Sequence, residues 1–326
     1  MSAGSPVKGN RFVIIGRAGM DLYPDPPGTR TETATRFFAC LGGSAANIAA
    51  AIVRLGGKAA LVTCVSDDAI GRFVTNQLDE YEIDRSHVRP VGGEARNSLA
   101  LVETRVEDHQ SVIYRNGAAD FQMGLEDVAG VDYTAFDALI TTGTVFAGEP
   151  SRTAALHAIG LARSAGLPVI FDVDYRPYSW SSARHASKTY SQIAALCDII
   201  IGNDKEFGFM AGRHDKGLDK ARTLASNSAA IVVYKMGPLG AITFTPDNQF
   251  KTGIYAVNAL KPTGAGDAFL GGFVTALAGG KPLQDAVLQG SACAAIVVAR
   301  VGCAPAMPTV LELERFVASQ PRPAST

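Results

Sequence analysis

Short apolar runs alternate along this chain of 326 residues with longer segments of helical periodicity. The runs at residues 12–16 and 59–65 are typical of buried strands, and the segments that begin at Ser44 and Asp67 have the spacing of helices. A strand–helix–strand–helix order favours a mostly parallel sheet covered by helices on both faces. Since we find neither an internal repeat nor a linker, we predict a single α/β domain over residues 1–326.

Two strands break this alternation, because residues 98–104 and 111–115 are joined by a short polar loop with no helix between them. They predict an antiparallel hairpin inserted in an otherwise parallel fold. Residues 16–24 are rich in turn formers, so we expect a loop there. We expect the tail from residue 320 onward to be disordered.

The composition is ordinary for a globular enzyme, with 47% hydrophobic residues, 19% charged residues and a net charge of −1. Such a balance gives no electrostatic reason to expect a nucleic-acid or membrane partner. No apolar run reaches the length of a membrane span, and the polar residues 1–10 do not resemble a signal peptide. The five cysteines lack metal-binding spacing, so we predict a cytoplasmic protein with reduced thiols.

The segment with the clearest chemistry is Gly264-Ala265-Gly266-Asp267, which lies directly before an apolar segment of helical length. The first N–H groups of a helix have no partner within it and can hold an anion, and glycine lets the backbone come close to that anion. Asp267 would then lie beside a phosphate, where it could accept a proton from an attacking hydroxyl. An ordinary glycine-rich turn before a core helix is the open alternative for this tetrapeptide alone.

Together with Gly-Gly-Ser-Ala-Ala-Asn at residues 42–47, the string Thr-Gly-Ala-Gly-Asp-Ala-Phe at residues 263–269 resembles the paired signatures of the ribokinase-like (PfkB) carbohydrate kinases. The resemblance covers nearly the whole chain. It implies a three-layer ribokinase-like fold with a small β-sheet lid, formed here by segments of about residues 17–40 and 95–118. It also implies ATP and Mg²⁺ as cofactors, a sugar substrate, and a homodimer through the lid.

The resemblance also assigns roles to individual residues. It makes Asp267 the catalytic base, with Gly264, Ala265 and Gly266 as the anion hole. The motifs Asn-x-x-Glu and Lys-x-Gly-x-x-Gly point to nucleotide binding by Asn203, Lys235, Gly237 and Gly240, to which the signature adds Gly264 and Gly266. Magnesium would be held through water by Asn203 and Glu206, and the sugar would be bound by Asp21, Gly43 and Asn47. For Asp21, Asn47 and the Asn203–Glu206 pair, a solvated loop or an ordinary helix start is the open alternative.

Two arginines bear on the choice of sugar. Arg115 ends a strand of the predicted hairpin, and Arg176 lies with Asp174 in the string Asp-Val-Asp-Tyr-Arg-Pro-Tyr-Ser-Trp at residues 172–180. By resemblance to sugar-acid kinases of the family, both would meet a substrate carboxylate, which suits the planar guanidinium. A surface charge or a phosphate contact is the alternative role for either arginine.

The strings at residues 16–23 and 172–180 together resemble the family members that phosphorylate the 6-hydroxyl of 5-dehydro-2-deoxy-D-gluconate in myo-inositol degradation. The alternatives are a 2-keto-3-deoxygluconate kinase or a fructokinase and, from another class, a non-catalytic sugar-sensing protein on the kinase fold. The intact Asp267 and its glycines argue against lost chemistry. One departure is Lys261, which stands where many family members place an aspartate that binds a monovalent cation, so we do not predict potassium activation.

Overall fold

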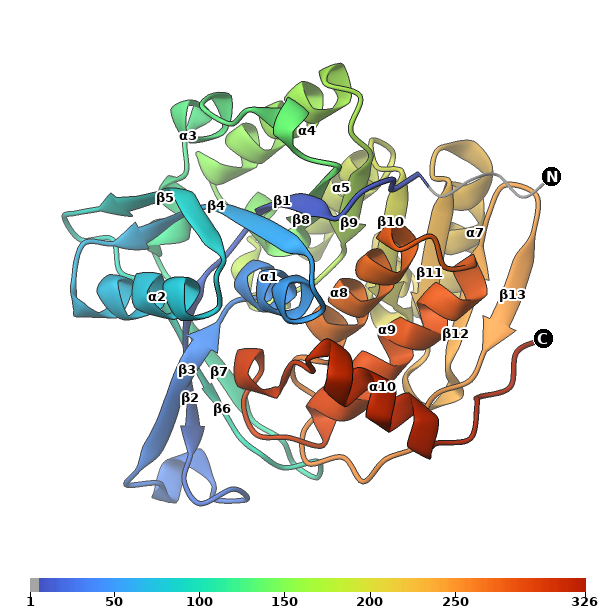
Figure 1. Cartoon of the computed structure of the whole chain (residues 1–326). Helices are drawn as coiled ribbons and strands as arrows, with labels where there is room; N and C mark the ends of the chain where they lie inside the picture. Colours follow the sequence, from blue (N-terminus) through green and yellow to red (C-terminus); the bar gives the residue numbers. More distant parts are fainter. Residues whose placement is uncertain (1–5) are drawn as a thin grey trace.

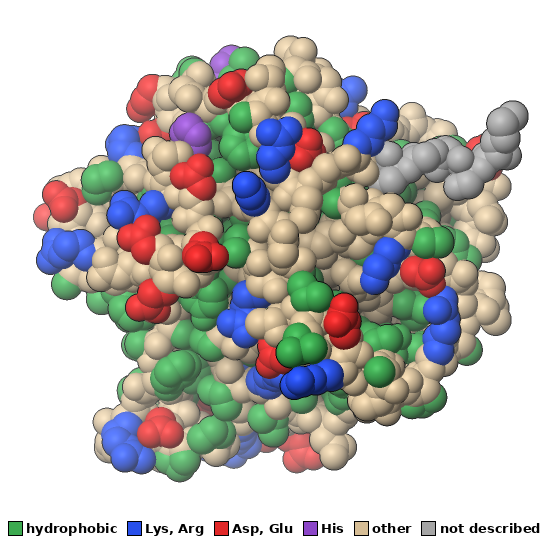
Figure 2. All heavy atoms as spheres, in the orientation of Figure 1, with side chains coloured by type: hydrophobic (Ala, Val, Ile, Leu, Met, Phe, Trp, Pro, Cys, Tyr) green, Lys and Arg blue, Asp and Glu red, His purple; other side chains and the backbone are tan. Residues whose placement is uncertain are grey.

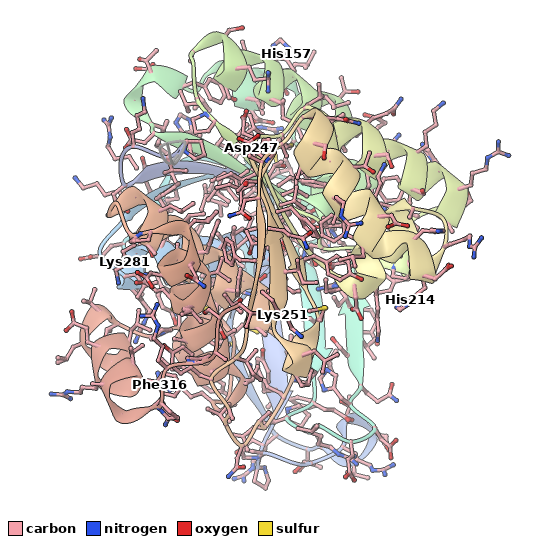
Figure 3. The ribbon with its side chains drawn as sticks, turned by 90° about the vertical axis from the view of Figure 1, so that its right-hand side faces the viewer. His157, His214, Asp247, Lys251, Lys281 and Phe316 are labelled. Carbon is pink, nitrogen blue, oxygen red and sulfur yellow. The ribbon has the colours of Figure 1, made fainter. Side chains whose placement is uncertain are left out.

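The computed structural model describes residues 6–326, and residues 1–5 of the polar N-terminal segment lie outside the described part. Residues 6–326 form a central sheet of nine strands and a second sheet of four strands (Figure 1). Viewed from the side, helices flank the central sheet on both faces, with Phe316 on one flank and His214 on the other (Figure 3). The predicted α/β class and the mostly parallel sheet are therefore confirmed.

The central sheet is parallel except at one edge, where its last two strands run antiparallel. Across the sheet, the strands are β13 (Gln249–Thr252), β12 (Ala241–Phe244), β11 (Ile231–Lys235), β10 (Ile199–Asn203), β9 (Val169–Asp172), β8 (Ala138–Thr142), β1 (Arg11–Ile15), β4 (Lys58–Ser66) and β5 (Asp84–Val91). After β1, the chain first adds β4 and β5 on one side of this strand. It later adds β8 and the strands that follow it on the other side. Ligands of such sheets bind beyond the carboxyl ends of the strands near this reversal.

Alternate residues of β1 lie in different cores, as expected of a strand that is buried on both faces. Val13 and Ile15 pack in the core beneath one helical layer, and Phe12 and Ile14 pack in the core beneath the other. The first layer consists of α3 (Leu125–Ala129), α4 (Ser151–Ser164), α5 (Ala183–Ala194), α6 (Asp204–Met210) and α7 (Gly217–Asn227). The second consists of α1 (Ser44–Arg54), α2 (Ala69–Glu80), α8 (Ala265–Ala278) and α9 (Leu283–Val298), with α10 (Val310–Ser319) packed outside α9.

The second sheet projects from one side of the molecule (Figure 1). Its order is β3 (Phe37–Gly42), β2 (Gly19–Pro24), β6 (Ser98–Val102) and β7 (Ser111–Tyr114). The predicted hairpin is β6 and β7, which pair antiparallel, so that prediction is confirmed. The prediction of a loop over residues 16–24 is wrong from Gly19 onward, because β2 pairs with β3 on one side and β6 on the other.

The C-terminal residues correct a second expectation. Lys251 and Thr326 exchange backbone hydrogen bonds of 2.7 and 2.9 Å, and the N–H of Gly253 donates to the carbonyl of Ala324. An edge strand carries unpaired backbone groups, and here the tail pairs with those of Lys251 in β13 and of Gly253 just after it. The tail is thus placed in the structure, whereas we predicted disorder.

Two other features complete the fold. Short 3₁₀ turns lie in the connections, at Thr31–Thr33, Ala119–Gln122, Tyr133–Ala135, Gly143–Ala147, Pro177–Ser179, His214–Lys216, Gly237–Leu239 and Ala304–Ala306. Among residues 6–326, no helix has the length and apolar character needed to cross a membrane. On the face shown in Figure 2, acidic and basic side chains are interspersed.

Candidate active site

Polar residues gather where three strands of the central sheet end and where α8 begins. Asp172 ends β9, Asn203 ends β10 and Lys235 ends β11, so all three lie at the carboxyl edge of the sheet. Asp267 lies in the first turn of α8. The Lys235 charge acts on both Asp172 and Asp267, which places the strand ends and the helix start around one space.

The start of α8 depends on glycine for conformation and for space. Gly264 has a left-handed φ of 85°, and an added Cβ would lie 2.8 Å from the sulfur of Cys303. The first bond of the helix runs from the N–H of Ala268 to the carbonyl of Gly264, at 3.0 Å. The preceding amides, of Ala265 and Gly266, therefore have no partner within the helix and are available to an anion.

The two sequence signatures meet at one hydrogen bond. Asn47 Nδ2, in the first turn of α1, donates to Asp267 Oδ2 at 2.8 Å, although the residues are 220 positions apart. The helices that carry them pack closely, because a Cβ at Gly271 would lie 2.4 Å from the Cβ of Ala51. Small residues on both helices are thus needed to bring the amide to the carboxylate.

The pKa of Asp267 is raised to about 7. Burial is the main cause and the nearby charge of Asp174 adds to it, while the bond from Asn47 and the charge of Arg176 act in the opposite direction. A carboxyl group with this pKa exchanges its proton near neutral pH, as a general base requires. The arrangement fits proton removal from a hydroxyl beside a bound anion.

A second group of charges lies around Asp21, at the base of the small sheet. The Asp21 carboxylate occupies the space that a side chain at residue 42 would need, since a Cβ there would lie 1.9 Å from Asp21 Oδ1. Gly43 has a φ of 92°, and a Cβ on it would lie 2.4 Å from the carbonyl oxygen of Arg17. The glycine pair therefore lets α1 begin directly against Asp21.

Burial raises the pKa of Asp21 to about 6, although the charges of Arg17 and Lys261 partly offset the effect. Burial also acts to raise the pKa of Asp174, but the charges of Arg176, Arg17 and Arg115 and the neighbouring hydroxyl of Ser44 together lower it. The two acids thus differ in how well their charge is balanced.

The two arginines predicted for the substrate each already have a carboxylate partner. Arg115 forms an ion pair with Asp120 in which both side chains are at most 5% exposed. Its Nη1 donates to the carbonyl of Thr144 at 3.0 Å, and its guanidinium lies over the ring of Phe121. Arg176 Nη2 lies 2.7 Å from Asp174 Oδ1. Sequence reasoning missed Asp120, which carried no motif.

Asn203 and Glu206 bind one another at the start of α6. The N–H of Asn203 donates to Glu206 Oε2 at 2.7 Å, and the N–H of Glu206 donates to Asn203 Oδ1 at 3.0 Å. This reciprocal pair caps the helix, which is the structural role left open above. Burial raises the pKa of Glu206 and the charge of Lys235 opposes that rise, so the carboxylate also faces the strand ends.

The Lys-x-Gly-x-x-Gly segment forms a tight turn after β11. Gly237 and Gly240 have φ values of 55° and 87°, and a Cβ on Gly240 would lie 1.9 Å from the carbonyl of Thr252. Lys235 Nζ lies 3.5 Å from the point that a Cβ on Gly266 would occupy. Lys235 is therefore next to the first turn of α8.

The oxygen donors at this edge fit Mg²⁺ held largely through water. Within the described range, no three or more His, Cys, Asp or Glu side chains group as a metal site. Asp172 and Asn203 nevertheless place oxygen atoms at the ends of the neighbouring strands β9 and β10, and Glu206 lies in the first turn of α6 after β10. Mg²⁺ prefers a few carboxylates together with water and phosphate.

Comparison with known proteins agrees with this geometry. Residues 10–310 match the model of the pfkB family carbohydrate kinases. The chain belongs to this family. It is therefore a phosphotransferase that acts on a hydroxyl group of a sugar, with ATP and Mg²⁺ as its cofactors.

Related PfkB proteins cover almost the whole chain. The present chain is 39% identical over 311 residues to a 5-dehydro-2-deoxygluconokinase of Photobacterium profundum, and the alignment covers 94% of each chain. It is 35% identical to the protein of the same name from Geobacillus kaustophilus, covering 94% of this chain and 93% of the other. A fructokinase double mutant of Vibrio cholerae, solved with fructose, ADP and potassium, has a TM-score of 0.84 and 27% identity, covering 95% of this chain and 99% of the other.

Proposed function

We propose that this PfkB kinase phosphorylates the 6-hydroxyl of 5-dehydro-2-deoxy-D-gluconate, a sugar acid of myo-inositol degradation. The observation that carries the chemistry is the Asp267 carboxylate, which has a pKa of about 7 beside the free amides of α8. The substrate is supported by the name shared by relatives that are 34–39% identical to this chain. It is also supported by the three arginines, Arg17, Arg115 and Arg176, whose charges act on Asp174.

In the proposed mechanism, Asp267 accepts the proton of the sugar hydroxyl as its oxygen attacks the terminal phosphorus of ATP in line. The amides of Ala265 and Gly266 hold the negative charge that develops on the transferred group, with Gly264 shaping the turn. Asn203 and Glu206 would hold magnesium through water, and the ion would neutralise phosphate charge. Lys235, Gly237 and Gly240 would lie along the nucleotide. The protein contributes mainly by positioning.

The sugar would lie between Asp267 and the base of the small sheet. We assign its contacts to Asp21, Gly43, Asn47, Arg115, Asp174 and Arg176. A guanidinium has five N–H donors, so Arg115 and Arg176 keep donors beyond those in their ion pairs. Within a single kinase domain, the small sheet would act as a lid that excludes water from the reaction.

The small sheet also presents an apolar face on which a second copy of the chain could pack. Leu101 lies opposite Leu22 on one side and Val112 on the other, and Tyr114 lies opposite Leu99. Val112 is 43% exposed and Tyr114 is 60% exposed. An exposed apolar face of this kind marks an association site, and identical copies commonly pair through the same face. We propose a homodimer through the lid, in a cytoplasmic protein whose five cysteines are all free and buried.

A charge placed on this face is expected to separate the dimer. Tyr114→Lys should halve the mass in solution, because two copies of the ammonium would face one another across a desolvated interface. Light scattering coupled to gel filtration measures the mass. Val310→Lys, at a 44% exposed site on α10, is the matched control and should leave the mass unchanged. A wild-type protein that is already monomeric would refute the dimer.

The substrate is tested by ADP release from the wild-type protein with MgATP. We expect a kcat/KM for 5-dehydro-2-deoxygluconate at least about 100-fold above that for fructose, because a missing charged contact costs about 3 kcal/mol or more. 2-Keto-3-deoxygluconate is the third sugar compared in this assay. Preference for that acid or for fructose would keep the kinase chemistry and replace the substrate. Absence of ADP release with all three sugars would contradict the proposal.

A further inference from the structure

Arg17 is a buried arginine that the mechanism above does not use. It lies between β1 and β2 at the carboxyl edge of the central sheet, and only 8% of it is exposed. Its side chain donates from Nη1 to the hydroxyl of Ser98 at 3.2 Å. Among residues 6–326, no carboxylate oxygen lies at ion-pair distance from its guanidinium, whereas Arg115 and Arg176 are paired with Asp120 and Asp174.

A charge in this position is costly unless an anion balances it. Removing a guanidinium from water requires compensation by a charged partner or by several hydrogen bonds, and a serine hydroxyl supplies only one neutral contact. Arg17 thus retains donors of its planar fork that Ser98 does not occupy. Within the described part of the chain, the guanidinium therefore has no ion-pair partner, and the more distant charges of Asp21 and Asp174 act on it.

The charged and titratable groups around Arg17 define where the missing anion belongs. Its positive charge opposes the rise in pKa that burial causes at Asp21 and Tyr178 and contributes to the lowered pKa of Asp174; these residues come from β2 and from the connection after β9. Asp21 and Asp174 are the acids assigned above to the sugar hydroxyls. An anion beside Arg17 would therefore lie next to the acids that are assigned to the sugar.

The backbone around Arg17 is held in place before any ligand arrives. Its carbonyl accepts from the N–H of Ala46 at 3.4 Å. The buried Asn97 donates to the carbonyl of Ala18 at 3.1 Å and accepts from the N–H of Ser66 at 3.0 Å. A fixed backbone reduces the entropy lost when the side chain binds its ligand.

We infer that Arg17 binds the carboxylate of the sugar-acid substrate and so selects an acid over a neutral sugar. The inference rests on the proposed function and deepens it. A guanidinium can meet both carboxylate oxygens at once, and Arg17 is available because no acid of the described chain pairs with it. Arg115 and Arg176 then shape the pocket through Asp120 and Asp174, with weaker contact to the substrate.

The test compares the sugar acid with its primary amide, which keeps the shape of the substrate and removes the charge. For Arg17→Met we expect kcat/KM for the acid to fall about 100-fold or more, chiefly through KM, with less than about threefold change for the amide. Arg17→Lys should give an intermediate loss of kcat/KM for the acid, because lysine keeps the positive charge but lacks the planar guanidinium that can bind both carboxylate oxygens. Arg213→Met, at an exposed arginine paired with Asp215, is the matched control and should match wild type.

A binding measurement separates recognition from folding. Trp180 is the one tryptophan of the sequence and follows Arg176 after one 3₁₀ turn, so we expect its fluorescence to report on sugar binding. Acid affinity should fall in Arg17→Lys while amide affinity and the melting temperature stay near wild type. Equal loss for acid and amide in this variant, or no loss for the acid, would overturn the role of Arg17. A wild-type enzyme that prefers neutral sugars would instead overturn the proposed substrate.

Discussion

Asp267→Asn is expected to lower kcat by about 10³-fold, within the 10²–10⁴ range of general-base catalysis. The substitution keeps the shape of the side chain and leaves an oxygen that can accept from Asn47 Nδ2, so the contact between α1 and α8 is retained. What is lost is the group that accepts the proton of the hydroxyl. ADP release under saturating sugar and MgATP measures the effect.

Two further measurements separate the loss of the base from a loss of binding or of folding, and the pH profile of the wild-type enzyme tests the pKa of Asp267. Affinity for ADP and the melting temperature should remain within about twofold and a few degrees of wild type. In the wild-type enzyme, kcat/KM should rise with pH through about 7, because the raised pKa leaves Asp267 protonated below that pH and ionised above it. If Asp267→Asn kept the wild-type kcat and the same rise of kcat/KM with pH, another group would be the base.

The parts of the fold that sequence predicts well are those with local signals. The start of α8 was predictable because Gly264 and the small residues at 265 and 266 lead into an apolar segment of helical length. The parallel strands were predictable because residues such as Phe12 and Val13 are apolar on both faces. By contrast, β2 contains Gly19 and Pro24, and its extended form comes from pairing with β3 and β6. Local propensity does not contain that pairing.

In the candidate site too, some features follow from local sequence motifs and others only from the folded structure. Asp267 and Asn47 each belong to a motif, and the helix packing that joins them is visible in the small residues of both helices. The contact of Arg115 with the Thr144 carbonyl and that of Arg17 with Ser98 depend on how distant segments meet, as does the lack of an ion pair for Arg17 among residues 6–326. Charge pairing in a pocket is a property of the folded chain, so sequence reasoning gave the residue types and missed which arginine is unbalanced.

Lys261 is the residue whose replacement should change the ion requirement of the enzyme. Its side chain is fully buried, and Nζ donates to the carbonyls of Thr263 at 2.6 Å and Val297 at 3.3 Å. Val297 lies in the last turn of α9, at the negative end of the helix dipole. The ammonium thus joins the peptide before Gly264 to α9 and fixes the turn that precedes the proposed anion hole.

Potassium binds to carbonyl oxygens as an ammonium does, so it should replace Lys261 when a carboxylate stands there. We expect a wild-type rate that is flat across potassium concentrations. Lys261→Asp should lose about 100-fold in kcat without potassium, the order of loss for a small misplacement of reacting groups, and recover with potassium or ammonium. Lys188→Asp, at an exposed site on α5, should behave as wild type.

The melting temperature of Lys261→Asp gives a second measure that does not depend on turnover. Without a cation, the new carboxylate would face the Thr263 and Val297 carbonyls and the nearby charge of Asp21, so the variant should melt below wild type. Potassium should raise the melting temperature of the variant and leave that of wild type unchanged. A variant whose rate and melting temperature both ignore potassium would show that the buried ammonium serves packing alone, and that the turn before Gly264 is held by other contacts.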